Sequence, residues 1–242
     1  MTDERRRVIV TGAGSGLGWA IAHRFVDQGA SVLAVDRLED RLVSFQAEHP
    51  GADTVGADVG TSAGADAVFA AVGDRLDVLC NNAGILDRLA LVDEAADDEF
   101  DLVMATNLRG PFILAHRAVP VMAAGGGGVI INTASVAGLR GARGGAAYTA
   151  SKWGLIGLTY SIAASGHEQN IRCVAVCPGG MTTQIGVGQD VSERGVALVQ
   201  AAEHGGFVDP DVVAKVVIFL ASDEAEHLNG VALPVDGGSI AS

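Results

Sequence analysis

The stretch VIVTGAGSGLG, residues 8–18, runs from a short apolar segment through a glycine-rich turn into a helical pattern. A strand that meets a helix at such a turn lets the backbone approach a pyrophosphate, and the helix N-terminus adds N–H donors and a favourable dipole. The glycines follow the spacing GxxxGxG from Gly12, because Leu17 stands where the common GxGxxG fingerprint has its third glycine. Taken alone, the stretch predicts either a phosphate site or a plain tight turn.

Short apolar runs and longer helical patterns alternate along the rest of the chain. The runs predict seven strands, and several are almost wholly apolar, as parallel strands covered on both faces are. Repeated β-α units predict an α/β fold with a doubly wound parallel sheet and right-handed crossovers. The predicted strands are 7–10, 31–36, 53–58, 77–80, 128–133, 171–176 and 231–235, and the predicted helices are 17–28, 39–48, 62–73, 97–123, 147–165 and 210–221.

The organisation of the chain points to one domain. Its 242 residues contain no linker or charge block that would divide them, so we expect a single domain over residues 1–242. The one long irregular stretch, at about 184–208, contains several glycines. A compact domain rarely keeps so long a loop without a use for it, and we expect a substrate lid there.

Composition excludes several classes of protein. Hydrophobic residues make up 49% of the chain and charged residues 19%, which is enough for a sizeable core. The formal net charge of −13 would repel a phosphate backbone, so we expect no nucleic-acid partner. There is no run of 18 apolar residues, and the N-terminal apolar run leads directly into the glycine turn without a cleavage site. We therefore expect a cytoplasmic protein without a membrane partner.

The three cysteines do not indicate a disulfide framework. Cys173 and Cys177 lie in one predicted strand, where four residues at ~3.3 Å each separate them by roughly 13 Å. That separation is too long for a disulfide. Together with Cys80, they are expected to be small buried hydrophobes. No Cys/His pair lies close by in the sequence, so we expect no metal site.

Acidic residues end the second and third predicted strands. Asp36 stands where a carboxylate would bind the ribose hydroxyls of an adenosine. The same carboxylate would repel the 2′-phosphate of NADP by about 4 kcal/mol at ~4 Å and an effective dielectric constant of ~20, which favours NAD. The adjacent Arg37 would weaken that preference. Asp58 either holds the adenine amino group or caps the next helix, and both interpretations stay open.

A tyrosine and a lysine share one face of the helix predicted at 147–165. Tyr148 and Lys152 are four residues apart. A free tyrosine has a pKa of about 10, too high for an efficient acid/base near neutrality. A neighbouring ammonium favours the phenolate and is expected to lower that pKa. The pair predicts an acid/base centre, although an exposed helical pair would have the same spacing.

Two further polar residues fit such a centre. Ser135 follows the strand at 128–133, and the carboxyl ends of strands in a doubly wound sheet are where ligands bind. Its hydroxyl would hold the substrate oxygen, or it is a turn or capping serine. Asn107 lies in an apolar context, where its amide would hold a water that relays protons from Lys152. A buried asparagine with all its bonds made inside the protein is the other interpretation.

Together these motifs resemble the classical short-chain dehydrogenase/reductase family over essentially the whole chain. Each is weak alone, but they occur in one order at compatible spacings. They are TGAGSGLG at 11–18, Asp36, Asp58, NNAG at 81–84, Asn107, Ser135, Tyr148-x-x-x-Lys152, Pro178-Gly179, FLAS at 219–222, NG at 229–230 and VDGG at 235–238.

The resemblance implies a Rossmann-type fold, a catalytic tetrad and a nicotinamide cofactor, NAD in preference to NADP. Tyr148 would be the acid/base, Ser135 would orient the substrate oxygen, and Lys152 would lower the pKa of Tyr148 and bind the nicotinamide ribose. Asn107 completes the tetrad. The implied cofactor contacts come from Gly12, Ser15, Gly16, Leu17, Asp36, Arg37, Asp58, Val59, Asn82, Ala83, Gly84, Tyr148, Lys152, Pro178, Gly179, Met181 and Thr183. A homotetramer built through the helices at 97–123 and 147–165 is also implied.

Three hypotheses of function follow. The first is an NAD-dependent oxidoreductase that moves a hydride between nicotinamide and a secondary alcohol or ketone. The second is a dinucleotide sensor without turnover, which would not need Ser135, Tyr148 and Lys152 together. The third is a reductase of 3-oxoacyl groups on an acyl carrier protein, served by NADPH. Asp36 opposes that cofactor, and Arg140 and Arg143 would meet the anionic carrier unless they are ordinary solvated loop residues.

Overall fold

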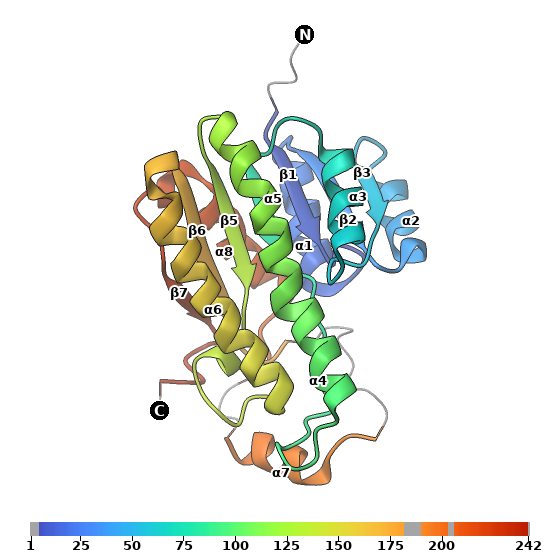
Figure 1. Cartoon of the computed structure of the whole chain (residues 1–242), viewed down its shortest axis with the longest axis vertical. Coiled ribbons are helices and arrows are strands. Elements are labelled where there is room, and N and C mark those ends of the chain that lie inside the picture. Colours follow the sequence, from blue (N-terminus) through green and yellow to red (C-terminus); the bar gives the residue numbers. More distant parts are fainter. Residues whose placement is uncertain (1–4, 182–189, 203–205, 242) are drawn as a thin grey trace.

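A seven-stranded sheet, in which all neighbouring strands run parallel, forms the centre of the molecule (Figure 1). The computed structural model describes residues 5–181, 190–202 and 206–241. The strand order is β3-β2-β1-β4-β5-β6-β7. The strands are β1 (Arg7–Thr11), β2 (Ser31–Asp36), β3 (Asp53–Gly56), β4 (Val78–Asn81), β5 (Gly128–Thr133), β6 (Ile171–Pro178) and β7 (Ala232–Val235). This arrangement confirms the doubly wound parallel sheet that the sequence predicts.

The helices follow the predicted pattern, with ends that differ by one or two residues. The helices at Glu39–Glu48 and Pro210–Ala221 have the predicted ends. The helices are α1 (Gly16–Asp27), α2 (Glu39–Glu48), α3 (Ser62–Val72), α4 (Asp97–Met104), α5 (Gly110–Ala124), α6 (Ala146–Gly166), α7 (Glu193–Ala202) and α8 (Pro210–Ala221).

Two predictions about helices need correction. The helix expected over 97–123 is divided into α4 and α5 by a π-helical turn at Ala105–Arg109. The stretch expected to be irregular contains α7. Gly195 lies inside α7. The residue there must be glycine, because a Cβ would stand 1.8 Å from the Leu89 carbonyl oxygen. This glycine serves close packing and not a loop, which is why its presence misled the prediction.

Helices cover both faces of the sheet. One hydrophobic cluster joins α1, α2 and α8 to one face, through side chains such as Phe25, Phe45 and Val217. A second joins α3, α5 and α6 to the other, through side chains such as Val68, Leu114 and Ile162. Figure 1 shows α5 and α6 in front of the sheet and α8 behind it. The sheet is therefore buried on both sides, which explains the almost wholly apolar strands.

The strand order fixes where a ligand binds. The chain winds outward from β1 to β3 and then returns to β4 on the other side of β1. At such a switch point the loops after neighbouring strands diverge to opposite faces, and a crevice opens at the carboxyl edge of the sheet. Most of the predicted site residues follow strands β1 to β6, so this edge gathers them.

Two other sequence predictions concern cysteines and membranes. Cys80, Cys173 and Cys177 are buried and free of disulfide bonds, as expected. Burial raises the pKa of the Cys177 thiol to about 11, so it is protonated at neutral pH. Within the described residues, no helix has the length and apolar character needed to cross a membrane.

Candidate active site

The glycine turn between β1 and α1 is shaped for a close backbone approach. Gly12 has φ of +68°, a region that L side chains rarely adopt. A Cβ at Gly18 would lie 2.0 Å from the Gly12 carbonyl oxygen, so only glycine lets α1 begin against the turn. The first residues of α1 line the crevice, and the Ser15 side chain makes no capping bond to their N–H groups. The turn therefore fits a pyrophosphate better than it fits a plain tight turn.

The NNAG segment forms the floor of the crevice. The Thr11 hydroxyl accepts the backbone N–H groups of Asn82 and Ala83, both at 3.0 Å. The Asn82 amide donates to the Thr11 carbonyl at 3.0 Å and accepts the Thr133 hydroxyl at 3.3 Å. These bonds tie the ends of β1, β4 and β5 together. Thr11 has no role in the sequence predictions, although its place at the end of β1 is a signal for one.

Asp36 lies at the end of β2, where its carboxylate is already organised. One oxygen accepts the Gly14 N–H and the other accepts the Leu38 N–H, each at 3.0 Å. Arg37 and Arg41 are both exposed and line the same end of the crevice. Arg41 also donates to the Ser15 hydroxyl at 3.4 Å. Arg41 is absent from the predicted site, because a residue in the first turn of an exposed helix gives no sign in the sequence of facing a ligand.

The structure excludes one of the two roles left open for Asp58. Its carboxylate accepts the Gly60 N–H at 2.9 Å, within the turn after β3. The cap of α3 is Thr61, whose hydroxyl accepts the Gly64 N–H at 3.0 Å. The helix-cap interpretation of Asp58 is therefore wrong. Asp58 is exposed and lines the crevice beside Val59.

Three side chains meet at the other end of the crevice. The Ser135 hydroxyl lies close enough to the Tyr148 phenol to favour its ionised form and so to lower its pKa. The Lys152 ammonium lies 5.5 Å from the centre of the Tyr148 ring and donates to the Thr133 carbonyl at 2.8 Å. Ser135 also accepts the Ala137 N–H at 3.1 Å, so it caps a short turn and serves the site at once. The strand end and the helix thus bring together the residues that the sequence paired.

The pKa of Tyr148 departs from the sequence expectation. Burial raises it to about 12, the hydrogen bond from Ser135 acts against that rise, and the charge of Asp87 adds to it. Burial also lowers the pKa of Lys152 to about 8. In the chain by itself, desolvation outweighs the nearby ammonium. Tyr148 is therefore protonated at neutral pH, and an added positive charge at the site would be needed to favour its phenolate.

Asn107 lies beside this group but makes its own bonds inside the protein. Its amide oxygen accepts the Ile85 N–H at 2.8 Å, and its amide nitrogen donates to the Ile85 carbonyl at 2.9 Å and the Ser151 hydroxyl at 3.1 Å. A Cβ at Gly84 would lie 3.3 Å from the Asn107 oxygen and 3.5 Å from Lys152 Nζ. Asn107 therefore adjoins Lys152 across a glycine and is not among the residues that line the crevice.

Asp87 is the most informative residue that sequence reasoning missed. Its carboxylate is buried and accepts the N–H groups of Tyr148 at 2.9 Å, Gly145 at 3.1 Å and Leu89 at 3.2 Å. Burial raises its pKa, and these three hydrogen bonds oppose the rise. The N-terminal residue of α6 has no capping side chain of its own. Asp87 caps α6 from a loop far away in sequence, which no local pattern reveals.

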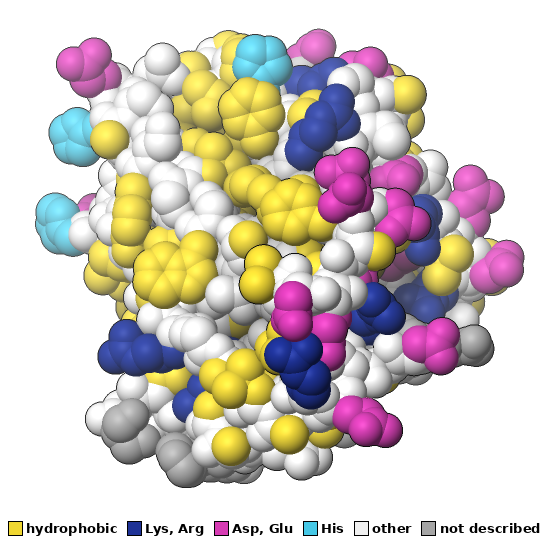
Figure 2. All heavy atoms as spheres, turned by 60° about the horizontal axis from the view of Figure 1, so that its bottom comes forward, with side chains coloured by type: hydrophobic (Ala, Val, Ile, Leu, Met, Phe, Trp, Pro, Cys, Tyr) yellow, Lys and Arg dark blue, Asp and Glu magenta, His cyan; other side chains and the backbone are white. Residues whose placement is uncertain are grey.

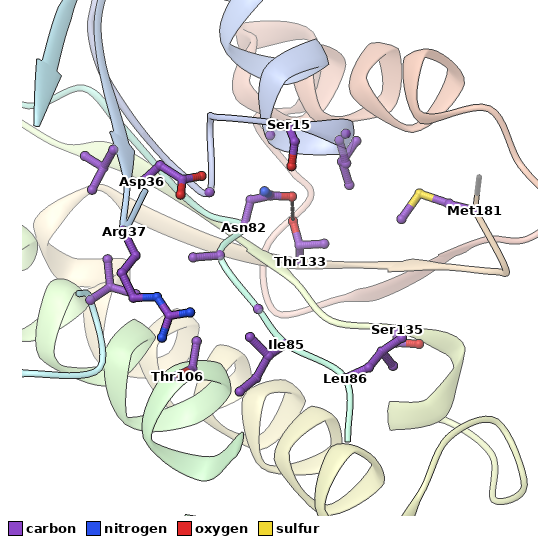
Figure 3. A pocket seen from close by; sticks show the side chains of 18 of the residues that line it. Ser15, Asp36, Arg37, Asn82, Ile85, Leu86, Thr106, Thr133, Ser135 and Met181 are labelled. Carbon is purple, nitrogen blue, oxygen red and sulfur yellow. Dashed lines mark hydrogen bonds between the residues drawn. The ribbon is translucent and has the colours of Figure 1, made fainter. Parts of the chain in front are cut away.

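One elongated cavity of about 400 Å³ runs from the glycine turn and Asp36 to the group of Ser135, Tyr148 and Lys152 (Figure 3). Asp36 and Arg37 lie at one end and Ser135 at the other, with Asn82 and Thr133 between them. Thr183 lies outside the described residues. The predicted residues that line the cavity are Gly12, Ser15, Gly16, Leu17, Asp36, Arg37, Asp58, Val59, Asn82, Ala83, Gly84, Ser135, Tyr148, Lys152, Pro178, Gly179 and Met181.

The shape and the donor set fit a dinucleotide. A glycine cradle and a helix N-terminus suit the pyrophosphate, and a carboxylate suits a ribose. A proton donor, a hydroxyl and an ammonium stand at the far end, where a substrate carbon would meet the reactive ring. The site can therefore move a proton to or from an oxygen beside a bound redox cofactor.

Comparisons with known proteins agree on one class. A family model described as enoyl-(acyl carrier protein) reductase matches residues 12–239. The chain is 39% identical over 241 residues to 3beta-hydroxysteroid dehydrogenase 2 of Eggerthella lenta, covering 95% of this chain and 93% of that one. It is 37% identical over 238 residues to D-threitol dehydrogenase of Mycolicibacterium smegmatis, covering 95% and 91%.

Solved structures are similar over the full length. The 3-ketoacyl-(acyl-carrier-protein) reductase from Brucella melitensis, complexed with NADH, has a TM-score of 0.87 at 30% identity and covers 97% of this chain and 98% of its own. A levodione reductase has a TM-score of 0.86 at 33% identity, with 98% of both chains covered.

Proposed function

The chain belongs to the classical short-chain dehydrogenase/reductase family of oxidoreductases, and from that premise we propose that it is an NAD(H)-dependent enzyme acting on a secondary alcohol or ketone. The observation that carries the proposal is the placement of Ser135, Tyr148 and Lys152 at one end of a cavity whose other end holds Asp36. A sensor of dinucleotides would need the cavity but not the three polar groups. Because these three groups lie together, an enzyme is favoured over a sensor.

In the proposed reaction, the cofactor would carry the hydride and the protein would carry the proton. When bound, the nicotinamide ring accepts a hydride from the alcohol carbon or returns one to the carbonyl carbon. The protein moves the accompanying proton. In reduction, Tyr148 donates its phenol proton to the carbonyl oxygen, and Ser135 donates a hydrogen bond that holds the oxygen in place. In oxidation, the alcohol proton passes to the Tyr148 oxygen.

Lys152 has two tasks in this proposal. Its ammonium would make the Tyr148 phenolate less costly, and its bond to the Thr133 carbonyl would hold it where it could bind the nicotinamide ribose. The cationic nicotinamide would act in the same direction on the pKa of Tyr148. Asn107, next to Lys152, fixes the loop after β4 against α6 and would position a proton-relaying water.

The adenosine end supports NAD over NADP. The carboxylate of Asp36 is held by two N–H groups and would accept the ribose hydroxyls, while it would repel a 2′-phosphate. The Brucella melitensis reductase, whose name states a complex with NADH, is similar over the same length. Asp58 and Val59 would lie against the adenine.

The proposed function also implies a domain organisation, a substrate lid and an oligomeric assembly. We propose one catalytic domain over residues 1–242, with a substrate lid around 184–208. Large hydrophobic side chains gather on the face that carries α5 and α6 (Figure 2). The exposed ones on α4, α5 and α6 are Phe100, Leu102, Phe112, Trp153 and Tyr160. Such a face suits a subunit interface, and we propose a homotetramer built through it. We also propose a cytoplasmic location.

A second candidate is a 3-oxoacyl-carrier-protein reductase that uses NADPH. Arg37 and Arg41 favour it, because two guanidinium groups near Asp36 would offset the repulsion of a 2′-phosphate. Arg143 gives it less support, because its guanidinium donates to the Ser239 carbonyl and so anchors the C-terminal segment. Arg140 is exposed and available to an anionic carrier.

One experiment separates these functions. The purified chain is titrated with NAD⁺ and with NADP⁺, beside an Asp36→Ala variant, and then assayed on a panel of secondary alcohols with and without Tyr148→Phe. Tighter binding of NAD⁺ and Tyr148-dependent NADH formation would support the dehydrogenase. Tighter binding of NADP⁺ would favour the acyl reductase. Binding of NAD⁺ with no turnover on a broad panel would favour the sensor.

A further inference from the structure

Two histidines and a glutamate meet at the ends of α1 and α2, far from the cavity. His23 lies in the last turns of α1, Glu48 ends α2, and His49 follows it. Their ligating atoms all lie within 4.8 Å of one another. Both helices begin at the carboxyl edge of the sheet and run away from it. The cluster therefore lies away from the carboxyl edge of the sheet, where Asp36 is.

The two imidazoles face each other through a hydrogen bond, and a metal ion could take the place of the proton between them. His23 Nδ1 and His49 Nε2 are 2.9 Å apart. A Zn²⁺ ion with bonds of about 2.0–2.1 Å to two nitrogens in tetrahedral geometry holds those nitrogens roughly 3.3 Å apart. The rings therefore need to separate by only a few tenths of an ångström to receive an ion. The Glu48 side chain is exposed, so it is free to turn and supply a carboxylate oxygen.

A fourth residue, Asp27, lies beside the other ring nitrogen of His23. The other ring nitrogen of His23, Nε2, lies 3.4 Å from the Asp27 carboxylate. A histidine that binds a metal usually donates its second N–H to such a group, which orients the ring and sets its tautomer. With the proton on Nε2 facing Asp27, His23 Nδ1 accepts the N–H of His49 Nε2, and a zinc ion would replace that proton. This is the arrangement that a metal-binding histidine needs.

Packing holds the second histidine in place. The His49 ring lies 4.7 Å from the ring of Phe45, which is fully buried. Phe45 in turn packs edge-on against Trp19 of α1, with ring centres 5.2 Å apart. His49 and His23 are thus supported by the contact between the two helices. A site built on supported rings loses little side-chain entropy when it binds an ion.

We propose that His23, Glu48 and His49 bind one Zn²⁺ ion that links α1 to α2, with Asp27 orienting His23. Two imidazoles and a carboxylate are a zinc-type donor set, and water would complete the coordination. The ion would stabilise the β1-α1-β2-α2 unit, whose other end carries the glycine turn and Asp36. No metal site was expected from the sequence, which has no close Cys/His pair and in which His23 and His49 lie 26 residues apart.

The test uses the untagged full chain, stripped of metal with a chelator and titrated with zinc chloride by calorimetry. We expect one zinc ion per chain. We also expect the melting temperature to rise by roughly 5–10 °C at free zinc about 100 times the dissociation constant. Magnesium chloride at the same concentration should leave it unchanged, since Mg²⁺ prefers oxygen ligands.

Variants make the test specific. His23→Gln and His49→Gln keep side-chain size and hydrogen-bonding capacity, and each should abolish the zinc-induced shift. Asp27→Asn should weaken zinc binding by roughly 10–100-fold. His227→Gln is the matched control, because His227 is an exposed histidine 3.5 Å from a single carboxylate, that of Glu226, and should bind zinc as the parent chain does.

Three outcomes of these measurements would contradict the proposed zinc site. Absence of a one-equivalent binding step would overturn the proposal. Equal zinc affinity in His23→Gln, His49→Gln and the parent chain would overturn it too, as would a loss in His227→Gln as large as theirs. Circular dichroism of each variant without zinc confirms that it is folded, so a lost shift reports on metal binding. None of these readouts depends on enzymatic activity.

Discussion

The buried carboxylate of Asp87 accepts the backbone N–H of Tyr148 at 2.9 Å and so connects the loop after β4 to the first turn of α6. It also accepts the Gly145 N–H at 3.1 Å, which satisfies a helix N-terminus that has no cap of its own. The phenol that we propose as acid/base is thereby positioned from the loop that follows the NNAG segment. The loop at the floor of the proposed cofactor site is therefore hydrogen-bonded to the helix that carries the proposed proton donor.

Replacing Asp87 should reduce turnover more than cofactor binding. In Asp87→Asn, an amide N–H₂ would face one of the backbone N–H donors, and the start of α6 would shift. Because small displacements of a reacting group cost rate steeply, we expect kcat to fall roughly 10–100-fold while the Kd for NAD⁺ changes little. Steady-state kinetics and a binding titration measure both. Asp98→Asn, on the exposed start of α4, is the control and should behave as the parent chain.

The pKa of Tyr148 can be measured directly, because the chain has only two tyrosines, Tyr148 and Tyr160. In Tyr160→Phe, Tyr148 is the sole phenol, and its ultraviolet titration should show a pKa of about 12 without cofactor. Saturating NAD⁺ should lower that pKa, since the nicotinamide brings a positive charge. A cofactor-free pKa below 10 would contradict the role that we assign to burial. Circular dichroism at each pH shows that the chain stays folded.

The charge of Asp87 should be visible in the same titration. Asp87 raises the pKa of Tyr148 through its negative charge. Adding Asp87→Asn to Tyr160→Phe should therefore move the phenol titration to lower pH. Asp98→Asn in the same background should leave it in place. An unchanged or raised pKa with Asp87→Asn would mean that the carboxylate does not act on Tyr148 through its charge.

Lys152 should destabilise the folded chain at neutral pH. Burial lowers its pKa from 10.5 to about 8, so the unfolded chain holds more protons between these values. Below about pH 8 the ammonium is charged in both states, and the burial penalty is roughly 3 kcal/mol. Lys152→Met should remove that penalty and lose a hydrogen bond worth ~1 kcal/mol. The expected net gain is ~2 kcal/mol, or about 4–8 °C in Tm at pH 7.

The pH dependence is the decisive part of that prediction. The stability of the parent chain should rise with pH from about 8 towards 10.5, so the advantage of Lys152→Met should shrink over that interval. Thermal unfolding at several pH values tests this. Lys215→Met removes the other lysine, which is exposed on α8, and should not reproduce the effect. A lower Tm for Lys152→Met at pH 7 would show that the ammonium stabilises the fold.

The charge of Asp36 should set the choice of cofactor. Asp36→Asn keeps an acceptor for a backbone N–H but removes the charge that repels a 2′-phosphate. With Arg37 and Arg41 at the same end of the cavity, we expect the ratio of NADP⁺ to NAD⁺ affinity to rise at least about tenfold, well within the Coulomb energy available. Binding titrations with both cofactors measure the ratio. Asp40→Asn, on the exposed start of α2, should not change it.

Local patterns in the sequence were enough for the architecture. The apolar runs predicted all seven strands, and the β-α alternation predicted their parallel order, because both depend on side-chain periodicity and short connections. Ser135 and Tyr148 were paired correctly, since the end of β5 and the start of α6 are close in the chain. Gly195 shows the limit: a glycine that permits contact with Leu89 looks, in sequence, like a glycine in a loop.

What the sequence by itself determined is therefore the set of elements, their order and the edge at which ligands meet. Only the tertiary structure decided how Asp87 reaches Tyr148, how Arg41 comes beside Ser15, and how His23 meets His49. These contacts join residues that are far apart in the chain and carry no common local pattern. The packing of helices onto a twisted sheet brings them together, and burial then sets the pKa values of Tyr148 and Lys152.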